Sequence, residues 1–491
     1  MFTLGTVDIV LFLVYLCVVF GVGVYFSRRQ KTAEDYFVGG RRMNWMAVGV
    51  SLFATSFSSI SFLAYPREGA YEDYHLFLTL LCIPLIIVPI LWFVFVPMFI
   101  RLKLTSIYEY LEIRFNRPMR RLGTILFAGY AIGWMGSMLY GMGLILQAVL
   151  GISGGQTVWL LVGIGVFAVM YTMLGGVQAV IWNDVLQTFV LGGGMILALV
   201  LALAKIDGGF GTVVSFGLEH GKFDMFNMTP DFLERRTFYA AIAFALFMYL
   251  PGYTVSQTTA QRYVCMSSLS EARRSLLVSA LVSTAVCLLF FFVGSTMFAF
   301  YHHTLGTGFP ELFRQDQLLP HFVVSEIAVT GLTGLLLAGL FAAAMSTIDS
   351  GINSLTAVVV YDWLSGRDTG VTVSRIMCVL FGALVIAAAL VAPLIGQHLI
   401  EIISKIVGVF LGLLLGVFLL GMFVPRANAP GAFIGLVAAS LALTVVWLYT
   451  PLPHWWYGGV TVSVTMLVGW IASPLFGKPS EEKLRGLFSA V

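Results

Sequence analysis

One acidic residue lies deep inside a long apolar stretch of the sequence. The stretch is FAAAMSTIDSGINS, residues 341–354, and its acidic residue is Asp349. If the stretch is helical, its polar residues at i, i+3, i+4 and i+7 share one face: Ser346, Asp349, Ser350 and Asn353. An ionised carboxylate in an apolar environment is unfavourable unless it is paired or coordinates a cation. This face is therefore a candidate cation site.

Two further apolar segments carry helix-breaking or polar residues. The segment SLFATSFSSISF (51–62) contains six hydroxyl residues between positions 51 and 61. The segment YLPGYTVSQTTAQRY (249–263) contains Pro251, which removes an intrahelical hydrogen bond, and Gly252, which permits unusual dihedral angles. We expect both segments to be broken helices. The alternative for the serine-rich segments is that their small residues only allow close helix packing.

Membrane-spanning helices are the elements that must position these residues. The chain has 491 residues, of which 59% are hydrophobic and 10% are charged, whereas an average soluble domain has roughly 25% charged residues. The sequence therefore predicts an all-α polytopic membrane protein with a single transmembrane domain over residues 1–491. A spanning helix needs about 20 mostly apolar residues, and about thirteen segments qualify, at approximately 7–26, 45–65, 75–100, 122–150, 157–174, 178–204, 237–263, 275–301, 328–362, 372–394, 397–424, 430–449 and 455–474.

The basic residues predict the orientation of the chain. We place about 20 of the 27 Lys and Arg residues on one side, beginning with Arg28, Arg29 and Lys31, and the positive-inside rule makes that side cytoplasmic. We expect a multi-pass protein of the cell (inner) membrane, with the N-terminus outside and the C-terminus in the cytoplasm. No basic residue precedes the first segment, which argues against a cleaved signal peptide. The net charge of +3 reflects this topology and does not indicate a nucleic-acid partner.

The two predicted broken helices are the second and the seventh of the series. They lie five helices apart and cross the membrane in opposite directions. Interrupted helices at corresponding places of two halves indicate an inverted repeat of five plus five helices, with a binding site near the midplane.

Four stretches of the chain resemble the sodium/solute symporter family, whose members have the LeuT-type inverted repeat. They are EDYFVGGRRMNW (34–45), LTSIYEYLEIRF (104–115), YTMLGGVQAVIWNDVLQ (171–187) and AAAMSTIDSGINS (342–354). The third is the most specific, because its glycine pair, Trp182, Asp184 and Gln187 match in type and spacing. The resemblance implies core repeats at about 45–204 and 237–424. It also implies a sodium-coupled secondary active symporter that imports a small organic solute by alternating access, and not an enzyme.

By this resemblance, the principal sodium site joins the second and the ninth helices. The backbone carbonyls of Ala54 and Phe57 would come from the second helix. The carbonyl of Ala343 and the hydroxyls of Ser346 and Thr347 would come from the ninth. Sodium is a hard cation, and hard cations prefer oxygen ligands of this kind.

Some relatives have a second sodium site, which would correspond to Asp184 with the hydroxyls of Ser346 and Ser350. Asp184 is explained equally well as a helix N-terminal cap. Asp349 departs from the family, whose members usually have a serine or another small residue there. It could be a ligand of a second sodium, a protonated carboxyl bonded to Ser346 or Asn353, or a member of an ion pair. Because two carboxylates in one apolar region repel each other, we predict that Asp349 and Asp184 hold a second sodium.

The expected solute cavity draws on the second, fourth and seventh helices. Lys405 lies four residues after Glu401, and it either pairs with this residue or attracts an anionic solute. The fourth-helix arginine of some sialic-acid-transporting relatives is missing, as are the acidic and amide residues that sugar-transporting relatives carry in the second helix. The sequence therefore does not decide whether the solute is a sugar, sialic acid, a monocarboxylate or a similar molecule. The expected lining residues are Ser56, Ser58, Ser61, Trp134, Met135, Tyr253 and Gln257.

Two other functions are the alternatives. A transporter-like membrane sensor needs a signalling domain, and the short segment after residue 475 contains none. A membrane-embedded hydrolase needs a nucleophile with a base or a metal cluster, and the sequence has no HExxH motif. The expected partners are a small-molecule solute, sodium as the coupling ion and the lipid bilayer.

Overall fold

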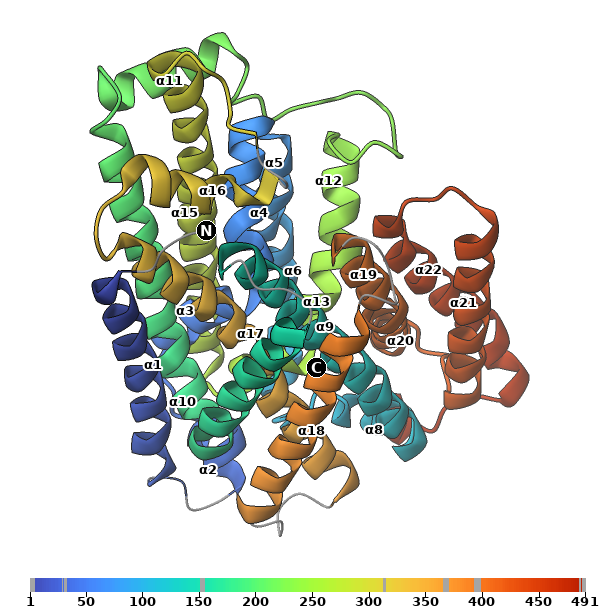
Figure 1. The fold of residues 1–491 in the computed structure, drawn as a ribbon. Coiled ribbons are helices and arrows are strands. Elements are labelled where there is room, and N and C mark those ends of the chain that lie inside the picture. Colours follow the sequence, from blue (N-terminus) through green and yellow to red (C-terminus); the bar gives the residue numbers. More distant parts are fainter. Residues whose placement is uncertain are drawn as a thin grey trace.

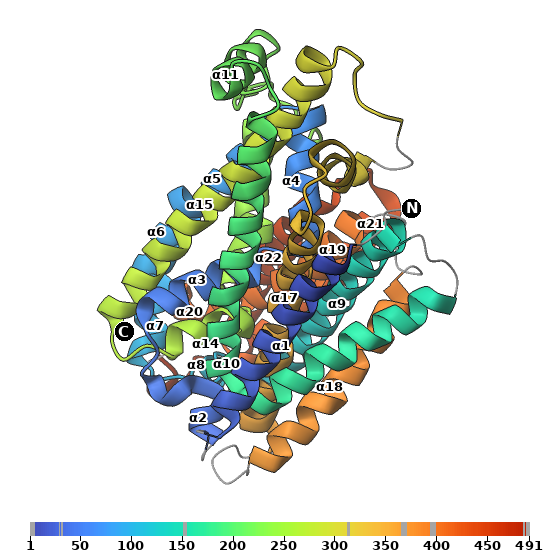
Figure 2. The same ribbon diagram turned by 60° about the vertical axis from the view of Figure 1, so that its left-hand side comes forward.

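Helices make up the regular structure of the part of the chain that the computed structural model describes. That part comprises residues 5–28, 30, 33–150, 155–311, 315–364, 371–392, 399–484 and 487, and no strand occurs in it. Ten of its helices are long and apolar enough to cross a membrane, and two bent helix pairs bring the number to 12. Figures 1 and 2 show the long helices lying side by side. The predicted all-α polytopic architecture is confirmed.

The predicted count of 13 helices depends on α10 (Gly155–Leu203), which is one helical run of 49 residues. A straight helix of that length would measure roughly 74 Å, more than twice the hydrocarbon thickness of a bilayer. Gly176 interrupts the run with φ 53° and ψ −163°. This interruption falls at the tight connection that the sequence predicts between helices at 157–174 and 178–204. The count of 13 itself stays a prediction.

The second predicted helix is broken at the serine-rich segment. Helix α3 (Trp45–Ser56) and helix α4 (Ser59–Tyr71) meet at an angle of 74°. Phe57 has extended dihedral angles, and the Ser58 hydroxyl caps α4 by accepting a hydrogen bond from the backbone N–H of Ser61. Because a helix end leaves its last carbonyls without intrahelical donors, the break presents backbone oxygens of α3 to the protein interior.

The seventh predicted helix is broken about one turn later than its proline suggests. Helix α13 (Leu250–Thr254) ends before Val255 and Ser256, and the chain bends there by 53° before α14 (Gln257–Val264) begins. Pro251 lies inside a continuous helix, Phe238–Thr254, directly after the π-helical turn Ala245–Tyr249. Proline is tolerated inside a membrane helix where such a π-helical adjustment accommodates the freed backbone groups.

Helix α17 (Leu332–Trp363) crosses the middle of the fold and is mostly buried. It packs against α10, against α9 (Arg117–Leu150) and against α1 (Thr6–Ser27). At Gly351 an added Cβ would lie 2.3 Å from the Met135 sulfur, so a larger residue there would displace the Met135 side chain. The polar face of α17 is consequently surrounded by protein.

The other helices surround this centre. In Figure 1, α21 and α22 lie next to each other at one side, and α5 and α11 mark the end of the molecule opposite α2 and α8. Their bounds are α2 Ala33–Val38, α5 His75–Cys82, α6 Val88–Ile90, α7 Val96–Arg101, α8 Glu109–Arg114, α11 Gly209–Glu219, α12 Phe238–Phe244, α15 Leu269–Ala299, α16 Leu318–His321, α18 Val371–Val391, α19 Leu399–Ile406, α20 Gly412–Phe423, α21 Ala429–Tyr449, α22 Tyr457–Ala472 and α23 Glu481–Leu484.

Candidate functional site

A small cavity lies where the break between α3 and α4 faces α17. Its volume is about 10 Å³, close to the space that one water-sized sphere occupies. Four of the five residues expected at the principal sodium site line it, namely Ala54, Phe57, Ala343 and Ser346. The break between α3 and α4 thus leaves a space of about the size of one water molecule beside these residues.

Hydroxyl and carbonyl oxygens converge beside this cavity. The Ser346 hydroxyl donates to the Ala54 carbonyl at 2.9 Å and to the Ala343 carbonyl at 3.2 Å. The Thr347 hydroxyl donates to the Ala343 carbonyl at 3.4 Å. These oxygens are the ligand type that a hard cation prefers, and they come from α3 and α17. The structure therefore brings together the residues of the predicted principal site.

Asp184 lies on α10 and is fully buried. The positive charge beside it is the side chain of Arg262. The Arg262 guanidinium donates from Nη2 to Asp184 Oδ2 at 2.8 Å and to the Ser350 hydroxyl at 2.6 Å. Its Nε donates to the Ser51 hydroxyl at 2.6 Å, and its Nη1 donates to the Thr258 carbonyl at 2.7 Å. The guanidinium therefore occupies the position beside Asp184 and Ser350 where the sequence predicts a second sodium.

Asp349 is also fully buried and faces different partners. Its Oδ2 accepts a hydrogen bond from the Tyr171 hydroxyl at 2.9 Å, and its Oδ1 accepts one from Ser350 at 3.3 Å. The hydrogen bonds of Arg262 all go to other groups. In the described part of the chain, Asp349 has no ion-pair partner.

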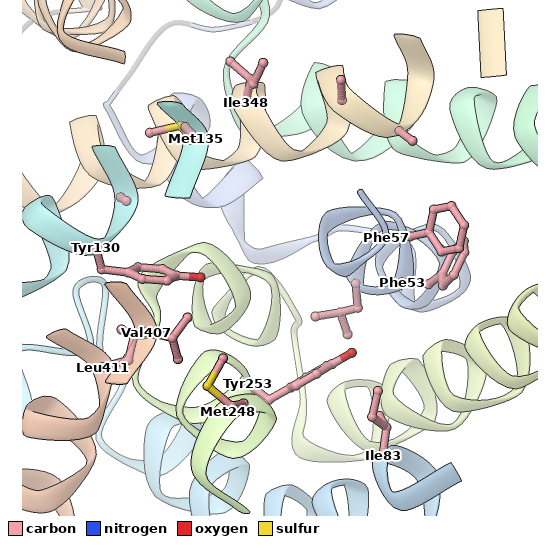
Figure 3. Packing of buried hydrophobic residues seen from close by; sticks show 14 of the residues in the cluster. Phe53, Phe57, Ile83, Tyr130, Met135, Met248, Tyr253, Ile348, Val407 and Leu411 are labelled. Carbon is pink, nitrogen blue, oxygen red and sulfur yellow. The ribbon is translucent and has the colours of Figure 1, made fainter. Parts of the chain in front are cut away.

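A larger central cavity of about 110 Å³ adjoins the sodium-site residues. Figure 3 shows Tyr130 on one helix and Met248 and Tyr253 on another, all three near this region. Thr347 and Phe57 also line it. None of the described residues around it is Asp, Glu, Lys, Arg or His; the polar ones are Thr55, Ser56, Tyr65, Tyr130, Trp134, Tyr249, Tyr253, Ser256, Thr258, Thr259, Ser283 and Thr347.

Of the expected solute-binding residues, Ser56, Trp134, Met135 and Tyr253 line the central cavity. The others lie elsewhere among the described residues. The side chains of Ser58 and Ser61 contact each other at the start of α4. The Gln257 amide accepts from the Ile107 backbone N–H and donates to the Thr105 carbonyl, both at 2.9 Å. The Lys405 ammonium lies 5.5 Å from the ring centre of Trp447, and the side chain of Glu401 lies outside the described residues.

Comparison with known proteins gives a consistent result. Residues 36–439 match the model of the sodium:solute symporter family. The chain is similar to the sodium/sialic acid symporter NanT of Aliivibrio fischeri, with 35% identity over 90% of this chain and 88% of that protein. It is similar to the human sodium-coupled monocarboxylate transporter 1, with 33% identity over 91% and 74% of the two chains. The structure of a Na+-coupled sialic acid symporter, in a substrate-bound outward-open state, superposes with a TM-score of 0.85 and 31% identity over 97% and 99% of the two chains.

Proposed function

Because the chain belongs to the sodium:solute symporter family and is a sodium-coupled symporter of a small solute, we propose a specific placement of ion and solute. Sodium binds at the small cavity, with the carbonyls of Ala54, Phe57 and Ala343 and the hydroxyls of Ser346 and Thr347 as ligands. The solute binds in the central cavity, among Ser56, Trp134 and Tyr253.

One observation supports coupling between the two sites. Phe53 and Phe57 line both cavities, and Thr347 lies next to Ser346 with its side chain at the central cavity. A sodium ion that fixes the carbonyls at the α3 break would also fix the position of these side chains. The ion would thereby organise the wall of the solute site, and its departure would release that wall.

The solute that best fits is a small organic monoanion. The names of two relatives specify sialic acid and a monocarboxylate. The central cavity offers hydroxyls and aromatic rings but no charged side chain, so an anion there would have the adjacent sodium as its positive neighbour. Binding the two together avoids burying either charge alone.

A single sodium ion accompanies each solute in this proposal. The residues of the second predicted ion site, Asp184 and Ser350, hold Arg262 instead. Asp349 then acts as a hydrogen-bond acceptor for Tyr171, or as its partner in protonated form, with no metal ligand role.

The proposal also includes the orientation of the chain in the membrane and the inverted repeat. The basic residues support an external N-terminus and a cytoplasmic C-terminus. The breaks at α3–α4 and at α13–α14 support inverted repeats over about 45–204 and 237–424. The end that carries α8 is the cytoplasmic one, and it is closed by buried polar contacts such as that of Arg120 with Asp362 at 2.6 Å. We therefore infer that the solute enters from the end with α5 and α11.

The test is sodium-dependent stability and uptake in a Ser346→Ala/Thr347→Ala variant. Sodium, compared with choline, should raise the melting temperature of the unchanged protein in detergent. The double variant should lose this shift and its sodium-driven uptake of lactate or sialic acid in proteoliposomes. Thr356→Ala is the matched control, because that hydroxyl lies on α17 and bonds only within the helix and to Cys378. A normal sodium affinity in the double variant would refute the placement of the ion.

A further inference from the structure

A second cavity lies beyond the central cavity, toward the end of the molecule that carries α5 and α11 (Figure 1). Its volume is about 60 Å³, and residues of α4, α5 and α12 form most of its wall. Tyr65, Leu80 and Tyr249 line both this outer cavity and the central one. These three side chains therefore form the partition between the two spaces.

The outer cavity differs from the central one because charged residues line it, namely Glu68 and Arg235. The carboxylate of Glu68 already pairs with two arginine side chains. Its Oε1 accepts from Arg67 at 2.6 Å, and its Oε2 accepts from Arg236 at 2.8 Å. Within the described part of the chain, Arg235 makes no hydrogen bond or ion pair. Its guanidinium therefore lines this cavity without a direct hydrogen-bond or ion-pair partner among the described residues.

Trp455 adds a second donor that has no acceptor. It lines the outer cavity, is 8% exposed, and its indole Nε1 has no hydrogen-bond partner among the described residues. The neighbouring Trp456 differs, because its Nε1 donates to the Phe232 carbonyl at 2.8 Å. A buried N–H without an acceptor is unfavourable, and a ligand oxygen would satisfy it after a small movement of the ring.

We propose that the outer cavity is a recognition subsite for the carboxylate of the incoming solute, built on Arg235 and Trp455. A guanidinium and an indole N–H are both donors, and a carboxylate accepts hydrogen bonds at each of its two oxygens. The apolar wall at Phe244 and Phe291 receives the body of the solute. This inference rests on the proposed uptake of an organic monoanion.

The subsite accounts for anion selection in a protein whose central cavity holds no basic side chain. The carboxylate is selected at Arg235 and Trp455, and the solute then passes Tyr65 and Tyr249 to reach the sodium-adjacent cavity. A charge-bearing outer cavity also raises the local concentration of anions, an effect that added salt weakens.

The experiment measures sodium-driven uptake of sialic acid, lactate and pyruvate in proteoliposomes, with the unchanged protein and with Arg235→Gln and Trp455→Phe. We expect Arg235→Gln to raise the KM of the transported anion about tenfold, as loss of a hydrogen bond to a charged group commonly does. Trp455→Phe should raise it less. The kcat and the sodium concentration for half-maximal rate should not change in either variant, because both residues lie outside the central cavity and the sodium site.

Two controls separate recognition from folding. Arg235→Lys keeps the charge and should recover most of the lost affinity. Trp456→Phe removes an indole N–H that already has an acceptor, so it should leave KM unchanged. The double variant of Arg235 and Trp455 should raise KM by less than the product of the two single increases, since both donors bind one carboxylate.

The outcomes distinguish the two levels of the proposal. If the unchanged protein transports an anion with sodium and Arg235→Gln leaves its KM unchanged while sodium still stabilises the variant, the subsite is wrong and the proposed function stands. If the unchanged protein transports none of the three anions with sodium, the proposed function fails and the subsite fails with it. An equal KM increase in Trp456→Phe would also refute the subsite, because it would indicate a general disturbance of this loop.

Discussion

Arg262 carries a positive charge into the interior of the fold. The side chain is 1% exposed and joins α14 to Asp184 on α10 and to Ser350 on α17. Removal of one partner from a buried ion pair commonly destabilises a protein by about 3–5 kcal/mol, because the other charge is left unpaired. Arg262 and Asp184 therefore act as a unit in stabilising this arrangement of three helices.

The two buried acids should respond differently to loss of charge. Asp184→Asn leaves Arg262 without its counter-charge, so we expect a loss of about 3–5 kcal/mol in unfolding free energy, or no stable protein. Asp349→Asn keeps an acceptor for Tyr171 and should retain its stability and uptake. Thermal unfolding in detergent and uptake in proteoliposomes measure both. Loss of one sodium from the coupling ratio in Asp349→Asn would instead support the second sodium site.

The family resemblance predicted that Ser346, Thr347 and the α3 break share a site, whereas helix periodicity alone placed only Ser346 on a polar face. The role of Arg262 could not be predicted from spacing. This residue follows a helix break, and the sequence pattern would equally place it in a cytoplasmic loop. One signal was available. An acid inside the membrane commonly pairs with a basic residue, and Arg262 is the basic residue nearest to the seventh-helix break.

At the scale of helices, glycines decide how closely α4 and α15 (Leu269–Ala299) approach. An added Cβ at Gly294 would lie 2.2 Å from the Pro66 carbonyl oxygen, and one at Gly69 would lie 2.1 Å from the Phe291 carbonyl oxygen. Both obstacles are backbone atoms, which cannot rotate away as a side chain can. We therefore expect α4 and α15 to move as a pair.

Gly294→Ala should separate this pair. Overpacking of a close contact typically destabilises a protein by about 1–3 kcal/mol, and we expect a lower melting temperature with reduced uptake. Gly192→Ala on α10 is the control, since an added Cβ there meets no atom within 4 Å. Equal melting temperatures for the two variants would contradict the close packing of α4 and α15.

The position of the helix breaks was partly predictable. The serine-rich segment breaks where the sequence suggests, but the seventh helix bends at Val255 and Ser256 and continues through Pro251 after a π-helical turn. Proline marks a local restriction on the backbone, whereas the place of a bend also depends on tertiary contacts. The Tyr108 hydroxyl, for example, donates to the Val255 carbonyl at 2.9 Å, and no local pattern reveals that contact.

For the whole molecule, the proposed one sodium and one monoanion would give a transport cycle that moves no net charge. The driving force is then the sodium gradient alone, about 1.4 kcal/mol for each tenfold ratio. A membrane potential imposed with potassium and valinomycin should leave the initial uptake rate unchanged, and ²²Na and labelled solute should enter in a ratio of one. Two sodium ions per anion would instead make uptake faster at negative internal potential, by about 2.3 kcal/mol of driving force per 100 mV.

The volume of the small cavity beside Ser346, about 10 Å³, has a further effect on the direction of transport. One water-sized sphere fills this space, so it admits a single ion at a time. In the proposed mechanism, sodium that enters from outside and sodium that is already inside compete for the same space. The site must therefore be emptied before the protein can start another cycle, and sodium inside proteoliposomes should slow solute uptake.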